Sequence, residues 1–116
     1  MTTGSTLLLT FDGLRRDRVT AEVMPNLSRF MAEGSDFLNS RSIFPSETRV
    51  AVTSTMTGNP PGAHGVVANQ YIHAVRPDGV FRTSEWEDLE LAAHAGQLLD
   101  RQTMVERVAA AGETIA

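Results

Sequence analysis

The stretch TLLLTFDG, residues 6–13, decides the fold expected of this chain. Its first six residues are leucine, phenylalanine or threonine on consecutive positions, a pattern typical of a strand covered on both faces in a parallel sheet between helices. The run ends at Asp12 and Gly13, so the aspartate follows the carboxyl end of the predicted strand. The stretch therefore predicts an α/β fold with a parallel sheet flanked by helices.

Apolar residues at helical spacing follow in four segments. These segments are residues 26–33, 48–57, 85–99 and 103–112. Gly34 and Gly58 stand where helix C-caps are expected. In the last segment, Thr103 and Glu106 have the spacing of a capping box. In the third, Trp86, Leu89 and Ala93 form a stripe that we expect to face the core.

The remaining segments point to a hairpin and to a further strand. A turn at residues 77–79 predicts a hairpin between residues 71–75 and 80–82. Residues 113–116 have the composition of the first residues of another strand. A domain rarely stops just as the next strand of its sheet begins. We therefore expect residues 1–116 to be the N-terminal portion of a single domain, with its sheet incomplete.

Composition narrows the possible functions. The 116 residues are 41% hydrophobic and 21% charged, with a net charge of −4 and no basic run that would favour nucleic-acid binding. The absence of cysteine excludes disulfides and thiolate metal sites, so any metal needs oxygen or imidazole ligands. The apolar run Leu7 to Leu9 is too short for a signal peptide or a membrane span, and a cytoplasmic location is expected.

Asp12 is the first candidate site residue. Open α/β sheets bind ligands beyond the carboxyl ends of their strands, and Gly13 leaves room for a close approach. A carboxylate there can be a metal ligand. It can also be an ordinary turn or capping aspartate, and position alone leaves both interpretations open.

Thr48 is the second candidate, directly before a predicted helix. A threonine there most often caps the helix. The same position puts its hydroxyl in the positive field of the helix N-terminus, which favours an alkoxide and an incoming phosphate. A neighbouring metal ion would lower the pKa of the hydroxyl and make it a usable nucleophile. Spacing alone leaves both roles open, with capping the commoner one.

The other polar candidates are an asparagine and three histidines. Asn69 can donate to a phosphoryl oxygen as charge develops, or it can be a turn residue. His64, His73 and His94 have no histidine or carboxylate partner at a recognisable ligand spacing, so we expect surface or structural roles for them.

Four motifs in order resemble one family. They are Leu7 to Arg15 (LLLTFDGLR), Met24 to Leu27 followed by Gly34, Phe44 to Thr48 (FPSET), and Thr57 to Asn69 with its Gly58, Pro61 and His64-Gly65-Val66. This series is similar to the opening of the type I phosphodiesterase / nucleotide pyrophosphatase family, part of the alkaline phosphatase superfamily. The resemblance covers approximately residues 6–71.

The resemblance implies an alkaline-phosphatase-like fold and a metal-dependent hydrolase of phosphate esters. By this resemblance Asp12 and Thr48 bind one of two zinc-like divalent ions. The resemblance also implies that Thr48 attacks phosphorus to give a phospho-threonine and that Asn69 steadies the transferred group. The expected partner is a small phosphate-ester substrate. The chain departs from many relatives at Arg49 to Val52, where they carry Asn-His, and no residue here matches the family's remaining metal ligands.

Other functions stay open beside this one. A truncated remnant without catalytic activity is one, because two ligands alone cannot hold a metal pair tightly. A sulfatase or phosphonate hydrolase of the same superfamily is another, although sulfatases use a nucleophile derived from cysteine or serine. A nucleotide-binding module is disfavoured because no glycine-rich phosphate loop follows residues 6–11.

Overall fold

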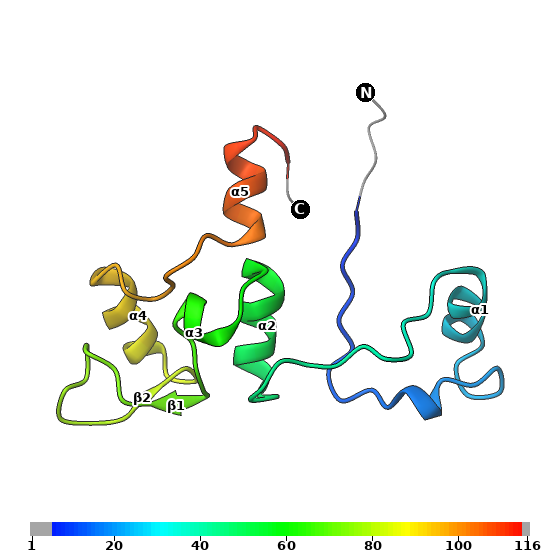
Figure 1. Cartoon of the computed structure of the whole chain (residues 1–116), viewed down its shortest axis with the longest axis horizontal. Helices are drawn as coiled ribbons and strands as arrows, with labels where there is room; N and C mark the ends of the chain where they lie inside the picture. The colour runs from blue at the N-terminus through cyan, green and yellow to red at the C-terminus, as the bar shows by residue number, and fades with distance from the viewer. Residues whose placement is uncertain (1–5, 115–116) are drawn as a thin grey trace. The chain divides into compact units, whose positions relative to one another are not determined.

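The computed structural model describes residues 6–114, in two compact units. The first unit runs to Ser40 and the second begins at Arg41, and each is described by itself. Figure 1 labels their elements in chain order. The described residues combine helices with a small two-stranded antiparallel sheet, so the α/β class is confirmed.

The first unit contains one turn of 3-10 helix and one α-helix. The turn η1 spans Arg16–Arg18, and α1 spans Pro25–Glu33, with a proline in its first turn, where the missing N–H costs nothing. Two ion pairs join side chains at the surface of this unit, one from Arg15 to Asp17 at 2.7 Å and one from Arg16 to Asp36. No residue between 6 and 40 is buried. This unit therefore has helical structure without a hydrophobic core of its own.

Residues 6–11 form no strand in the structure, which therefore does not confirm the buried strand predicted for them. They run as an elongated, unpaired stretch (Figure 1). Leu7 is 80% exposed and Leu9 64%. The strands found among residues 6–114 pair only with each other, and antiparallel. A run of apolar residues shows that a segment needs cover on both faces, but not which residues provide it. No parallel sheet forms within the described residues.

The second unit contains the other elements. They are α2 (Thr48–Thr57), α3 (Pro61–His64), β1 (Gln70–Tyr71), β2 (Phe81–Arg82), α4 (Trp86–His94) and α5 (Met104–Ala110). Its buried apolar residues are Val50, Val66, Phe81 and Ala92. The core of this unit is thus built from α2, the segment after α3, β2 and α4.

Two helices follow their sequence signals closely. The bounds of α2 match the prediction, and Gly58 ends it at φ 68°, a left-handed conformation that suits glycine. The capping box of α5 is also confirmed, since Thr103 accepts from the Glu106 N–H and the Glu106 carboxylate accepts from the Thr103 N–H. The short helix α3 was not among the helical segments expected from the sequence.

The hairpin and α4 differ from their predictions in extent. The strands pair Gln70 with Arg82 and Tyr71 with Phe81, so the ladder is shorter than expected. Helix α4 ends at His94 rather than Leu99. Its predicted inward stripe was wrong, because Trp86 is 74% exposed while Asp88 and Ala92 are buried.

Hydrogen bonds explain this orientation of α4. The Asp88 carboxylate accepts from the Arg82 N–H at 2.7 Å and from Arg76 Nε at 2.6 Å. These bonds fix the Asp88 face of α4 inward, which turns Trp86 to the surface. Among residues 6–114 no helix is long and apolar enough to cross a membrane.

Candidate functional site

Thr48 is the first residue of α2, and the N-cap position belongs to Glu47. The backbone of Glu47 is extended, with φ −93° and ψ 144°, and its side chain makes no capping hydrogen bond. Helix capping was the commoner of the two roles expected for Thr48, but in the structure the N-cap residue is Glu47. Thr48 itself is exposed, in the first turn of a ten-residue helix whose N-terminus carries partial positive charge.

Glu47 connects the start of α2 to Asn69. Its carboxylate accepts a hydrogen bond from the Asn69 N–H, across 22 positions of sequence. The Asn69 carbonyl in turn accepts from the Thr83 N–H at 2.9 Å and from the Thr83 hydroxyl at 3.0 Å. Both backbone groups of Asn69 are therefore held, while the residue as a whole stays exposed.

These contacts bring two of the three candidate residues into one region. Thr48 follows Glu47 in the chain, and Asn69 is hydrogen bonded to Glu47. Asp12, the third candidate, is exposed and belongs to the first unit. Glu47 could not be predicted as part of this region from local sequence, because a contact over 22 positions leaves no local pattern. The motif FPSET, which contains Glu47, was the only signal that pointed to it.

His64 is fully buried and ties α2 to α3. Its Nδ1 accepts from the Val66 N–H at 3.2 Å, so the ring proton lies on Nε2, which donates to the Ser54 hydroxyl at 2.8 Å. Burial lowers the pKa of His64, against the field of Asp100, which raises it. The ring is thus a neutral structural bridge, as expected for a histidine without ligand partners.

The other histidines have separate surroundings. His73 Nδ1 accepts from the Val75 N–H at 3.2 Å, and its ring packs 4.9 Å from the ring of Phe81. His94 lies exposed in the last turn of α4. None of the three joins a cluster that could ligate a metal ion within the described part of the chain.

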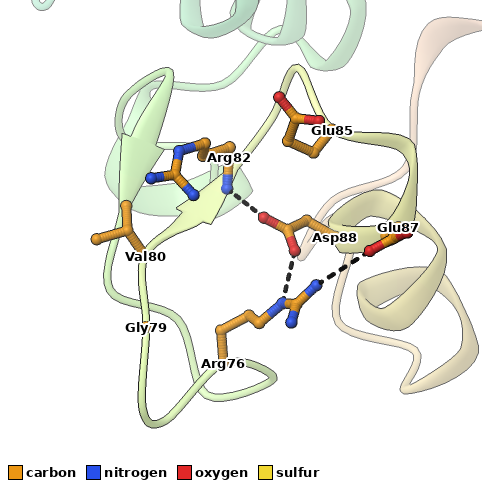
Figure 2. Close-up of a pocket in the computed structure, with 7 residues that line it drawn as sticks. All are labelled: Arg76, Gly79, Val80, Arg82, Glu85, Glu87 and Asp88. Carbon is orange, nitrogen blue, oxygen red and sulfur yellow. Dashed lines mark hydrogen bonds and ion pairs between the residues drawn. The ribbon is translucent and has the colours of Figure 1, made fainter.

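A charged pocket of about 380 Å³ lies between the loop after β1, β2 and the start of α4 (Figure 2). Its lining residues are Arg76, Gly79, Val80, Arg82, Glu85, Glu87 and Asp88. None of Asp12, Thr48 and Asn69 lines it. The pocket therefore contains none of the three candidate residues.

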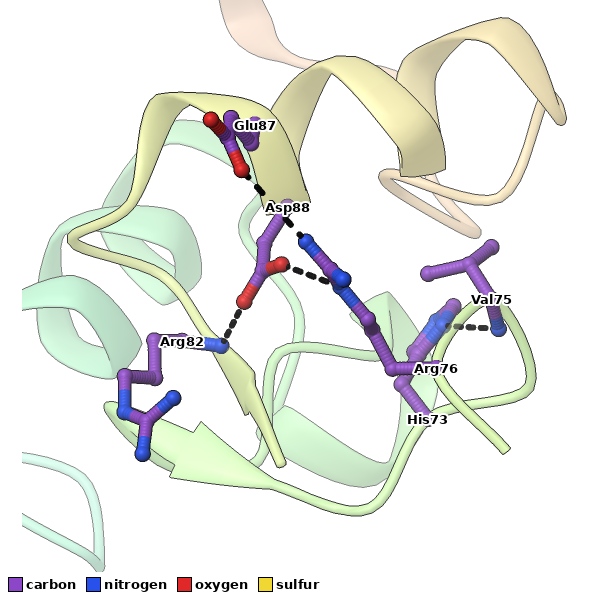
Figure 3. Close-up of polar contacts among 6 residues, drawn as sticks. All are labelled: His73, Val75, Arg76, Arg82, Glu87 and Asp88. Atoms are coloured by element: carbon purple, nitrogen blue, oxygen red, sulfur yellow. Dashed lines mark hydrogen bonds and ion pairs between the residues drawn. The ribbon is translucent and has the colours of Figure 1, made fainter. Parts of the chain in front are cut away.

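Asp88 organises this pocket. Figure 3 shows its carboxylate between the Arg82 backbone nitrogen and the Arg76 side chain, which also reaches Glu87 at 3.8 Å. The hydrogen bond from the Arg82 N–H lowers the pKa of Asp88 most, and Arg76 lowers it further, against burial, which raises it. Because the buried carboxylate is paired on both oxygens, the cluster serves to hold the fold.

The residues present supply only part of a metal site. A carboxylate and a hydroxyl, as at Asp12 and Thr48, are oxygen donors of the kind that divalent cations bind. Within residues 6–114, however, no three histidine, aspartate or glutamate side chains come together in a ligating arrangement. The described residues alone thus do not fit a pair of bound ions.

Comparisons with known proteins agree on one family. Residues 6–116 match the family model described as type I phosphodiesterase / nucleotide pyrophosphatase. A curated relative, bis(5'-adenosyl)-triphosphatase enpp4 of Xenopus laevis, is 40% identical over 68 residues, which cover 59% of this chain and 15% of the relative. The chain thus matches a small share of that relative's length. No solved structure matches the chain.

Proposed function

This chain belongs to the type I phosphodiesterase / nucleotide pyrophosphatase family, and we propose that the protein it is part of hydrolyses phosphate esters with Thr48 as its nucleophile. Family membership supports a hydrolase of phosphodiester or pyrophosphate bonds. The relative in Xenopus laevis is named for hydrolysis of a bis-adenosyl triphosphate. We therefore propose a small phosphate diester or nucleotide pyrophosphate as the substrate class.

The observation that carries this proposal is the hydrogen bond from the Asn69 N–H to Glu47. It places the residue before Thr48 against the residue proposed to contact the phosphoryl group. A hydroxyl at a helix N-terminus lies in a field that stabilises negative charge on the hydroxyl and on an incoming phosphate. The Asn69 side-chain amide is the donor proposed to stabilise charge on the phosphoryl oxygens.

The proposed reaction has two steps. Thr48 Oγ1 loses its proton to solvent and forms a bond to phosphorus, while the bond from phosphorus to the leaving oxygen breaks and that oxygen keeps the electron pair. Water then attacks the phospho-threonine, which releases phosphate or a phosphate monoester and restores the hydroxyl. The helix field favours the first step because it lowers the cost of the alkoxide.

We also propose that the complete protein binds two divalent ions, Zn²⁺, with Asp12 and Thr48 as two of the ligands. Such ions would supply charge neutralisation at the phosphate. The remaining ligands would come from residues outside this chain, as would the strands that make residues 6–11 part of an alkaline-phosphatase-like parallel sheet. In this proposal, residues 1–116 form the N-terminal portion of one catalytic domain.

The test uses the protein made from the whole reading frame that contains this chain. With bis(p-nitrophenyl) phosphate as substrate, Thr48→Ala is expected to lower kcat by about a thousandfold or more, because the nucleophile is lost. The matched control is Thr55→Ala, which removes an exposed hydroxyl from the same helix that is bonded to the Ala51 carbonyl at 2.9 Å. A Thr48→Ala protein that is folded and keeps half of the activity would refute the assignment.

A second candidate is a non-catalytic segment. Two observations favour it: no metal-ligating group forms among residues 6–114, and no residue between 6 and 40 is buried. Titration of Zn²⁺ by calorimetry into the protein made from the whole reading frame separates the two possibilities. Two sites of micromolar or tighter affinity would count against the non-catalytic segment, whereas millimolar binding would count against the metal-dependent hydrolase.

A further inference from the structure

The carbonyl of Asn69 is held by the strand opposite. Gln70 pairs with Arg82, so Asn69 lies opposite Thr83 in the same register. The Thr83 N–H and hydroxyl both donate to the Asn69 carbonyl, at 2.9 and 3.0 Å, and extend the β1–β2 ladder by one residue. Because Thr83 is only 4% exposed, these two bonds are shielded from water.

The N–H of Asn69 is held by a carboxylate from a different element. Glu47, the half-buried residue directly before α2, accepts this N–H with a side-chain oxygen. A hydrogen bond to an ionised acceptor is roughly twice as strong as one between neutral groups. With Thr83 on the carbonyl and Glu47 on the N–H, the backbone on both sides of the Asn69 Cα is fixed, and only side-chain rotation is left to direct the amide.

A glutamate at position 47 has a cost for the proposed reaction. Its negative charge directly precedes Thr48, where the reaction brings an anionic phosphate, and like charges at short range repel. The Glu47 side chain makes no capping bond to α2 either. Neither attraction of the substrate nor capping of the helix accounts for this carboxylate, whereas its bond to Asn69 does.

We propose that Glu47 is a positioning residue that acts on the reaction through Asn69. This inference rests on the proposed function, in which the Asn69 amide stabilises charge on the phosphoryl oxygens. Such a donor is effective when it is already directed at the oxygen as charge develops. The Glu47 bond ties the residue before Thr48 to the backbone that carries this amide, and thereby sets their spacing. A displacement of about 1 Å in such an arrangement can cost about a hundredfold in rate.

A double-mutant cycle tests this role in the protein made from the whole reading frame, with bis(p-nitrophenyl) phosphate as substrate. Glu47→Ala is expected to lower kcat by about ten- to a hundredfold. KM is expected not to rise, because the variant removes a negative charge near the phosphate. Glu47→Gln keeps an acceptor oxygen and is expected to recover most of kcat. In the Asn69→Ala background, Glu47→Ala is expected to cause no further loss.

Two more variants complete the design. Glu90→Ala removes an exposed carboxylate from α4 and is the matched control, with kcat expected to stay at the wild-type level. Thr83→Val loosens the Asn69 carbonyl and still tests the positioning if Glu47→Ala does not fold. It keeps the backbone bond and removes the hydroxyl bond, so kcat is expected to fall by about two- to tenfold, and not to fall in the Asn69→Ala background.

Amide exchange at Asn69 gives a readout that does not need turnover. The exchange rate is expected to rise in Glu47→Ala and to stay unchanged in Glu90→Ala. An unchanged rate in Glu47→Ala would overturn the proposal. So would an equal loss of kcat from Glu47→Ala with and without the Asn69 side chain, because Glu47 would then act elsewhere. Turnover that survives Thr48→Ala would refute the proposed function instead, and amide exchange would still decide whether Glu47 holds Asn69.

Discussion

His64 provides the sharpest test of how the second unit is held together. Replacing it with alanine removes the hydrogen bond to Ser54. It also leaves the Val66 N–H, which donates to His64 Nδ1 in the wild type, without an acceptor. The lost bond contributes about 1 kcal/mol, and a buried donor without a partner costs about 2 kcal/mol. His64→Ala is therefore expected to lower the free energy of unfolding by about 3 kcal/mol, before any loss of packing is counted.

A matched variant separates the two hydrogen bonds. In His64→Asn the side-chain oxygen can take the place of Nδ1 and accept a hydrogen bond from the Val66 N–H. The shorter side chain cannot make the hydrogen bond to Ser54. This variant is expected to cost about 1 kcal/mol from that bond plus a packing loss, less than alanine. His94→Ala changes an exposed histidine on α4 and is expected to fall within about 0.5 kcal/mol of the wild type.

The assay is urea unfolding followed by circular dichroism at 222 nm, with amide exchange at Val66 as a local readout. Exchange at Val66 is expected to speed up in His64→Ala and much less in His64→Asn. The reasoning would be refuted if His64→Ala unfolded within 0.5 kcal/mol of the wild type. It would also fail if alanine and asparagine gave equal losses, because the Val66 bond would then have no measurable role.

Three further predictions concern the same unit. Gly65→Ala is expected to cost about 1–2 kcal/mol, because Gly65 has φ 90° and an added Cβ would lie 2.8 Å from Asp100 Oδ2, whereas Gly62→Ala meets open space and serves as its control in urea unfolding. Thr103→Ala is expected to lower the stability of α5 by about 1 kcal/mol and to speed up amide exchange at Glu106, with an unchanged exchange rate counting against the capping box. The free energy of unfolding is expected to decrease in two pH windows as the solution is made more acidic. Burial lowers the pKa of His64 below its ordinary value of 6.5, so the unfolded chain binds more protons than the folded one and stability declines as the pH falls below about 6.5. The Arg82 N–H lowers the pKa of Asp88 below 3.8, so a second decline begins near that pH, and urea unfolding of His64→Asn as a function of pH should lack only the first window.

Local signals in the sequence predicted much of the second unit. The bounds of α2 follow from Gly58 and from helical spacing, and the cap of α5 follows from Thr103 and Glu106 three residues later. These features depend on atoms within a turn or two of each other. The periodicity that places Trp86 toward the core failed because a hydrogen-bonded carboxylate, Asp88, decided which face of α4 turned inward.

Features that depend on distant residues were beyond the sequence. The consecutive apolar residues 6–11 predicted a covered strand, yet the one sheet found among residues 6–114 pairs β1 with β2 and does not include them. The contact between Glu47 and Asn69 joins positions 22 apart, and each residue alone has an ordinary local role. The motif order predicted Thr48 and Asn69 as a functional pair, and it carried no information on how the chain connects them.

The hydrogen bond made by the Glu47 side chain bears on whether Thr48 acts as a helix cap or as a nucleophile. An N-cap side chain normally satisfies a free N–H of the first helical turn, and losing that bond typically costs about 1 kcal/mol. At α2 the N-cap is Glu47, whose carboxylate binds the Asn69 N–H rather than its own helix. The helix thus begins without a side-chain cap, an arrangement that leaves its N-terminal field directed at whatever lies before Thr48. The N–H groups and the positive field at a helix N-terminus favour anion binding. The bond that Glu47 makes outside its own helix is therefore in keeping with the role proposed for Thr48, and Thr48→Ala is the variant that tests this role.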